Sequence, residues 1–128
     1  MFEGLKRFIE LRDSEYHGFN FCCGVAAEGL EDPARELRPI VRYVGDRKKI
    51  FNGHFRNIKG TVPKFRECFI DEGSVDPFDV IATLRDADFT EFLITDHVPH
   101  IVDDTSWGHR GRAYAIGYMK ALIDGAYR

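Results

Sequence analysis

The chain has 128 residues, a usual length for one domain, and we expect residues 1–128 to form a single domain. It is 44% hydrophobic and 30% charged with a net charge of −3, as in ordinary globular proteins. It carries no basic stripe of the kind that nucleic-acid binders use, and no apolar run approaches the ~18 residues of a membrane span, so we expect neither partner.

The charged residues near the start of the chain and its cysteine content both indicate where in the cell the protein is expected. Glu3 and Lys6 interrupt the apolar stretch that a signal peptide would need. The cysteines are Cys22, Cys23 and Cys68, an odd count with an adjacent pair, which does not resemble a disulfide framework. We therefore expect a reducing, cytoplasmic location.

Four segments show helical signals. Residues 2–12 carry an apolar stripe at helical spacing. Asp32-Pro33 and Asp76-Pro77 are strong helix starts, because Asp caps free N–H groups and Pro at the first helical position loses no hydrogen bond. The first of these helices is expected to end at Gly45, and a last helix is expected over 111–126.

Three short strands are expected between the helices, over 18–22, 49–57 and 91–95, with loops over 23–31, 58–75 and 98–108. Within the second loop, residues 65–70 look extended. Helices alternating with short strands indicate βα units with a parallel sheet. A full (β/α)8 barrel needs about 250 residues, so this α/β chain is either a compact domain or part of a TIM barrel.

Residues with useful chemistry follow all three expected strands, where parallel α/β folds form their sites. They are Cys22 and Cys23, then His54 and Arg56, then Asp96 and His97. Each has a plainer reading when taken alone. A free Cys is usually a small core residue, an Asp before a loop often caps the backbone, and a His-x-Arg pair often belongs to a surface ion-pair network.

Together, the thiol, imidazole and carboxylate suit Mn²⁺, Fe²⁺ or Zn²⁺ better than Ca²⁺ or Mg²⁺, which prefer oxygen alone. We predict that the Cys22 sulfur, a His54 ring nitrogen and an Asp96 oxygen converge within a few Å, because metal–ligand bonds are only ~2.0–2.3 Å long. Arg56 beside such a site would fit an anionic substrate, for instance a sugar acid.

Several segments, in this order and spacing, resemble the D-mannonate dehydratase family of the xylose-isomerase-like superfamily. They are Phe21–Gly24, Gly53–Lys59, Asp71–Asp76, Asp96-His97, and a Gly-rich stretch leading into Ala115–Tyr118. The resemblance implies a metal-dependent (β/α)8 barrel, of which this chain would be the C-terminal portion with the last three or so βα units. It implies an enzyme, a lyase that converts D-mannonate to 2-dehydro-3-deoxy-D-gluconate and water in hexuronate (glucuronate) catabolism.

The resemblance also implies roles for individual residues. The metal ligands would be Cys22, His54 and Asp96, holding Mn²⁺ or Fe²⁺. Arg56 and Asn57 would bind substrate. Catalysis would use Arg56, His97 and His109, the last in a place where the family has a Tyr.

One further metal-binding His of the family, on an earlier strand, has no match before Cys22. We therefore expect either a homo-oligomer or a complementing N-terminal barrel segment. Two alternatives stay open: another sugar isomerase or epimerase of the superfamily, and a non-catalytic fragment that pairs with another chain.

Overall fold

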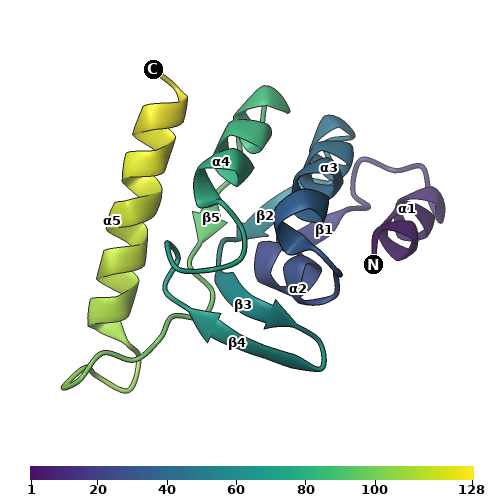
Figure 1. The fold of residues 1–128 in the computed structure, drawn as a ribbon. Helices are drawn as coiled ribbons and strands as arrows, with labels where there is room; N and C mark the ends of the chain where they lie inside the picture. The colour runs from purple at the N-terminus through teal and green to yellow at the C-terminus, as the bar shows by residue number, and fades with distance from the viewer.

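Helices and short strands alternate along the chain, and the computed structural model describes residues 1–128 (Figure 1). The helices are α1 Phe2–Glu10, α2 Cys23–Glu28, α3 Pro33–Asp46, α4 Pro77–Asp86 and α5 His109–Ala126. The strands are β1 Phe19–Cys22, β2 Ile50–His54, β3 Asn57–Thr61, β4 Lys64–Cys68 and β5 Leu93–Ile94. None of the helices combines the length and the apolar character needed to cross a membrane.

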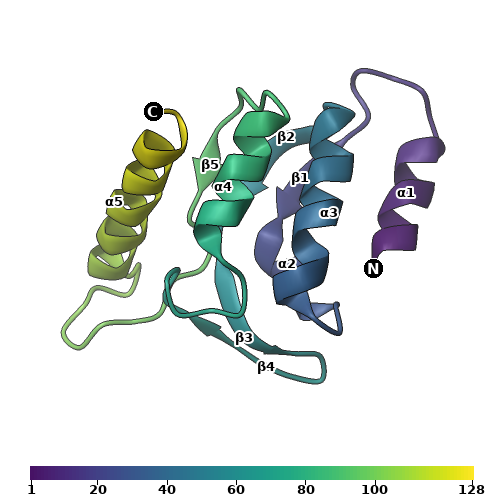
Figure 2. The same cartoon turned by 45° about the horizontal axis from the view of Figure 1, so that its top comes forward.

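The central sheet is parallel and has the order β1-β2-β5, which confirms the predicted parallel arrangement. Cys22 at the end of β1 pairs with His54 at the end of β2, and His54 pairs with Ile94 of β5. The carboxyl ends of the three strands therefore lie side by side. Helices α3 and α4 lie over one face of this sheet in both views (Figures 1 and 2).

The register between β1 and β2 shifts once. Phe19 pairs with Ile50, but Asn20 pairs with Asn52, so Phe51 is an extra residue on β2. Such a bulge breaks strict alternation. Ile50 can therefore be buried in the core, at 4% exposure, while Asn52 turns with Asn20 toward the face away from the helices.

Both predicted Asp-Pro helix starts are confirmed. The Asp32 side chain accepts a hydrogen bond from Arg35 N, and the Asp76 side chain accepts one from Phe78 N, and in each case Pro follows at the first helical position. The two helices then bury their apolar faces in one core, to which the sheet contributes Phe21 and Ile50. Their buried side chains are Leu37, Ile40, Val41 and Val44 of α3 and Val80, Ile81 and Leu84 of α4.

Three of the expected loops and strands are wrong in detail. The expected loop 23–31 contains α2, which the Cys22 thiol caps by accepting a hydrogen bond from Val25 N at 3.4 Å. The expected strand 49–57 ends at His54, and Asn57 already belongs to β3. The expected loop 58–75 contains the antiparallel hairpin β3–β4, of which β4 overlaps the extended piece expected over 65–70. The tip of the hairpin is tied to the end of α2 by Val62 N, which donates to Glu28 O at 2.8 Å.

Candidate metal centre at the carboxyl ends of the strands

Cys22, His54 and Asp96 converge as predicted. The Cys22 Sγ lies 3.5 Å from Asp96 Oδ2, and the His54 Nδ1 lies 3.4 Å from Asp96 Oδ1. One ligand atom from each residue lies within 4.8 Å of the other two. The neighbouring ends of β1 and β2 supply the first two side chains, and the turn after β5 supplies the third.

These separations leave room for a bound cation. The two shorter distances end on different oxygens of Asp96, and one atom from each residue lies within 4.8 Å of the others, so the side chains would draw in slightly around an ion whose ligand bonds are about 2.0–2.3 Å long. The His54 and Asp96 side chains are 20% and 17% exposed, so the group is sheltered and can still be reached. A thiol, an imidazole and a carboxylate together favour a first-row divalent metal.

The backbone of Asp96 is held in an unusual conformation. Its φ is +55°, in the left-handed region that non-glycine residues adopt rarely. Arg112, from the first turns of α5, donates from Nη1 to the Asp96 carbonyl oxygen at 2.8 Å and to Thr95 Oγ1 at 3.1 Å. Arg112 therefore braces the turn that points the Asp96 carboxylate at Cys22 and His54.

Arg56 is buried among three carboxylates, with its side chain 7% exposed. Its Nε donates to Asp96 Oδ2 at 3.0 Å and its Nη2 to Glu28 at 3.3 Å. Its Nη1 lies 3.5 Å from Glu67 Oε1 and is buried without a hydrogen bond. Burial alone would lower the pKa of Arg56, but the charges of Cys22, Glu28 and Glu67 raise it overall, so the guanidinium remains charged.

The same surroundings shift the pKa of the acidic groups. Burial alone would raise the pKa of Asp96, but the His97 charge, the hydrogen bond with Cys22 and the charges of His54 and Arg56 lower it below its usual range. Burial raises the pKa of the Cys22 thiol, and raises that of the fully buried Cys23 to about 12. Cys22 is therefore the more available thiol of the adjacent pair.

The two predicted catalytic histidines, His97 and His109, differ in how close they lie to the triad. The His97 side chain is 60% exposed, with Nδ1 2.5 Å from Glu67 Oε1 and Nε2 3.7 Å from Asp96 Oδ1, so it adjoins the triad. His109 is the first residue of α5, and its Nδ1 bonds Thr105 Oγ1 at 2.9 Å. His97 therefore contacts the candidate centre directly, whereas the contacts of His109 are with the loop before α5.

Asn57, predicted to bind substrate, is 5% exposed. Its Nδ2 donates to the carbonyl oxygens of Ile70 and Val75, at 2.9 and 2.7 Å. Its Oδ1 accepts from the N–H groups of Ile58 and Val75, at 3.0 and 3.3 Å. These hydrogen bonds use both the oxygen and the nitrogen of the side-chain amide. In this geometry Asn57 has a structural role, because it holds the 70–75 loop against β3.

Sequence reasoning did not single out four polar residues that touch the predicted ones, or a fifth that touches one of the four. The four are Asn20, Glu28, Glu67 and Arg112, and the fifth is Asn52, which bonds Asn20. A signal existed for Asn20 and Asn52, which stand two residues before Cys22 and His54 on neighbouring strands and therefore share their face. The other three come from distant segments and had no local signal.

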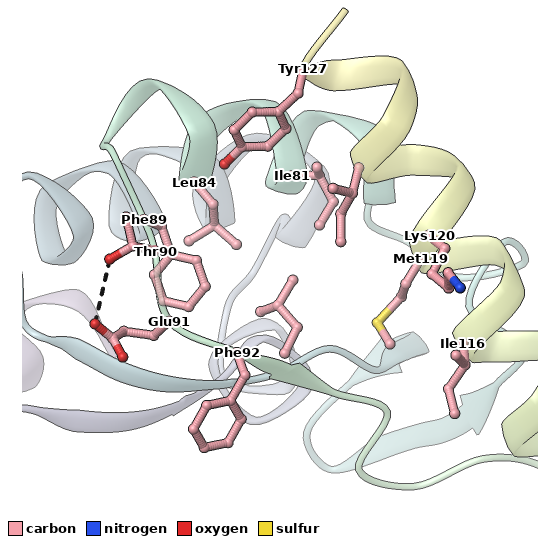
Figure 3. A pocket seen from close by; sticks show the side chains of 12 residues that line it. Ile81, Leu84, Phe89, Thr90, Glu91, Phe92, Ile116, Met119, Lys120 and Tyr127 are labelled. Atoms are coloured by element: carbon pink, nitrogen blue, oxygen red, sulfur yellow. Dashed lines mark hydrogen bonds between the residues drawn. The ribbon is translucent and has the colours of Figure 1, made fainter.

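The largest cavity, about 500 Å³, is separate from the triad and lies between α4, α5 and the segment 89–93. Figure 3 shows Ile81 and Leu84 of α4 on one side of it and Ile116 and Met119 of α5 on the other. Its polar lining residues are Thr90, Glu91 and Lys120. None of the predicted catalytic or metal-binding residues lines this cavity. The cavity is therefore not part of the candidate metal centre.

Comparison with known proteins gives a consistent result. The family model for D-mannonate dehydratase (UxuA) matches residues 1–128. Mannonate dehydratase 2 of Halalkalibacterium halodurans is 33% identical over 121 residues, covering 92% of this chain and 33% of that protein. Mannonate dehydratase of Thermotoga petrophila is 30% identical over 123 residues, covering 94% of this chain and 32% of that protein.

A solved structure agrees. The crystal structure of mannonate dehydratase from Streptococcus suis serotype 2 matches with a TM-score of 0.87 and 28% identity, covering 97% of this chain and 36% of that one. The chain thus spans about a third of the length of the curated relatives that it matches. Because the family model matches all 128 residues, the chain belongs to the D-mannonate dehydratase family.

Proposed function

We propose that this chain carries the metal-binding end of an enzyme that dehydrates D-mannonate to 2-dehydro-3-deoxy-D-gluconate and water, in hexuronate catabolism. The observation that carries the proposal is the convergence of Cys22, His54 and Asp96 within 4.8 Å at the strand ends. Membership of the D-mannonate dehydratase family supports the substrate and the reaction. The mixed donor set suits Mn²⁺, Fe²⁺ or Zn²⁺, and the resemblance to the family narrows our proposal to Mn²⁺ or Fe²⁺.

The three ligands would bind the cation, and Arg56 would bind the substrate carboxylate. A bound divalent cation would polarise the carboxylate and hydroxyl oxygens of a sugar acid and so favour loss of the C2 proton. Arg56 keeps the Asp96 carboxylate oriented through its Nε. Its Nη1, which lacks a hydrogen bond, is the nitrogen left for a substrate carboxylate, and Glu67 is the group that such a carboxylate would displace.

Dehydration requires one proton to be taken and one to be given. A base removes the C2 proton, and an acid protonates the C3 hydroxyl, which leaves as water; the resulting enol then becomes the 2-keto acid. His97 adjoins the triad and is exposed enough to reach a substrate, so we assign it to proton transfer at one of its ring nitrogens. His109, the first residue of α5, is the second candidate.

The architecture that we propose is the last three or so βα units of a (β/α)8 barrel. The outer edges of β1 and β5 have no neighbouring strand in the sheet, and both would be paired in a closed barrel. A complementing N-terminal segment, or further copies of the chain, would supply the partner strands. The three free thiols are in keeping with a cytoplasmic location.

The test is metal analysis together with turnover. The purified chain, alone and mixed with a segment that supplies the remaining barrel strands, is loaded with Mn²⁺ and given D-mannonate, and the 2-keto product is measured. We expect one bound metal, reduced binding in Cys22→Ser, and turnover in the complemented sample. Metal binding without mannonate turnover, but with conversion of an aldose or ketose from a panel, would instead favour a sugar isomerase or epimerase.

A further inference from the structure

We propose that Asn20 is a positioning residue for the candidate metal centre: it holds the His54 ring through Nε2, so that Nδ1 faces the cation, and it accepts the Nε2 proton when the cation is bound. The inference rests on the proposed metal-binding function. Asn20 Nδ2 lies 3.0 Å from His54 Nε2, and Asn20 Oδ1 accepts from Asn52 Nδ2 at 3.0 Å. The two asparagines and His54 thus form a continuous hydrogen-bonded row.

The sheet places this row beside the ligands. Asn20 pairs with Asn52 across the β1–β2 register, and Cys22 pairs with His54 one step further along the same face. The extra residue Phe51 lets this polar face coexist with the buried Ile50 on the same strand. The Asn20 amide therefore reaches Nε2 of His54, while Nδ1 of the same ring faces Asp96.

The two ring nitrogens have different tasks. His54 Nδ1 is 3.4 Å from Asp96 Oδ1, so it is the nitrogen that faces the ligand cluster. A metal ligand must present a lone pair, and a neutral imidazole has only one bare nitrogen. With Nδ1 on the cation, the proton must sit on Nε2 and needs an acceptor.

Asn20 can serve both states of the ring. When Asn20 Nδ2 faces the ring, it donates to a bare Nε2, and the ring proton is then on Nδ1, which faces Asp96. When its amide turns over, Oδ1 accepts the Nε2 proton, and Nδ2 then faces Asn52, whose amide turns with it. No hydrogen bond of the row is lost, because each contact is kept with donor and acceptor exchanged. Neither an aliphatic nor an acidic side chain can do both.

The first test is metal affinity of the full chain by calorimetry with Zn²⁺ and Mn²⁺. Asn20→Leu removes the acceptor at nearly constant size, and we expect affinity to fall about 10–100-fold, as when other outer partners of metal-binding histidines are lost. Asn20→Asp keeps an acceptor and should retain wild-type affinity or exceed it. Asn52→Leu, which does not touch the ring, should lose less than Asn20→Leu.

A second measurement reads the tautomer directly. In ¹⁵N spectra of the His54 ring, we expect the proton on Nδ1 without metal and on Nε2 after loading with Zn²⁺. Thermal unfolding of the metal-free variants separates this role from a structural one, because a merely structural Asn20 would lower the melting temperature and leave the metal affinity of the folded protein unchanged.

Three outcomes would overturn the inference. One is an Asn20→Leu variant that binds metal as tightly as wild type, and another is a loaded ring that keeps its proton on Nδ1. In both cases the proposed function survives, because the metal still binds. If wild type binds no metal at all, the proposed metal centre fails first, and the role of Asn20 fails with it.

Discussion

Arg112 Nη1 donates to the carbonyl oxygen of Asp96 at 2.8 Å, so the last helix holds the left-handed turn that presents the Asp96 carboxylate. Its Nε also donates to Trp107 O at 2.9 Å, which ties the preceding loop to the same guanidinium. One side chain thus joins β5, the loop and α5. Orientation of the candidate ligand and anchoring of the helix depend on the same contacts.

We expect Arg112→Ala to lower the free energy of unfolding by about 1.5–3 kcal/mol, the usual size for hydrogen bonds to a charged group. Metal affinity should fall as well, because the Asp96 turn loses its brace. Urea denaturation and metal titration measure the two effects. Arg110→Ala is the matched control on the same helix, since the Arg110 side chain reaches only Val102 O, at 3.2 Å. Equal behaviour of the two variants would contradict the bracing role.

Arg56→Met should destabilise the fold. The change leaves Asp96 and Glu28, whose side chains are 17% and 19% exposed, without their shared cation. Breaking a buried ion pair by removing one partner typically lowers stability by about 3–5 kcal/mol. Adding Glu28→Gln to the first change should recover part of that loss, because a neutral amide tolerates burial better than an unpaired carboxylate. Chemical denaturation of both variants at neutral pH measures the effect, and a single variant as stable as wild type would refute it.

Gly73→Ala should lower the stability of the fold, because a Cβ at this position would lie 1.9 Å from Cγ and Oδ1 of the Asn57 amide. The amide would have to leave the backbone groups that it binds, and overpacking of this kind costs about 1–3 kcal/mol. Gly117→Ala on α5 is the contrasting control, since nothing lies within 4 Å of its Cβ and alanine favours a helix by roughly 0.5–1 kcal/mol. Melting temperatures should therefore move in opposite directions; a shared direction would count against this reading.

Asp104 should make stability depend on pH. Its carboxylate accepts from the N–H groups of Thr105, Arg110 and Gly111, in place of the cap that Gly108 cannot provide at the start of α5. Desolvation alone would raise the pKa of Asp104, but these backbone hydrogen bonds and the Arg110 charge together lower it overall. A lowered folded pKa means that the stabilisation is present above the unfolded value of about 3.9 and is lost as pH falls through the folded value.

The Asp104→Asn variant, which cannot ionise, should show a weaker loss of stability on acidification below about pH 4 than wild type. Urea midpoints measured at neutral pH and at stepwise lower pH give the comparison. Parallel pH profiles of the two proteins would show that Asp104 is not one of the groups responsible.

The main helices and the parallel strands could be predicted because their signals are local. Asp32 and Asp76 act as caps next to Pro in the structure as in the sequence. The hairpin β3–β4 could not be predicted from the sequence. The residues of β4 from Lys64 to Glu67 are all exposed and show no alternation of apolar and polar positions. Its pairing depends on contacts such as Val62 N with Glu28 O, which link segments far apart in the chain.

The candidate ligands could be predicted because each follows an expected strand, and parallel strand ends meet at one edge. The charged residues that contact these ligands or their partners could not be predicted. Glu28 lies on a helix that was expected to be a loop, Glu67 lies on a hairpin within an expected loop, and Arg112 is the fourth residue of α5. His54 and Arg56 both contact the carboxylate of Asp96, His54 at Oδ1 and Arg56 at Oδ2.

The ion pairs of Arg56 also bear on the order in which the molecule folds. Arg56 joins Glu28, which lies 28 positions away, to Asp96, which lies 40 away, so two long loops must close before the guanidinium finds its partners. The entropy of closing these loops is lost before the contacts are made, so we expect the ion pairs to form late in folding. Metal capture should therefore lag behind helix formation in refolding experiments, and a stopped-flow trace of metal binding would time the closure of the whole sheet.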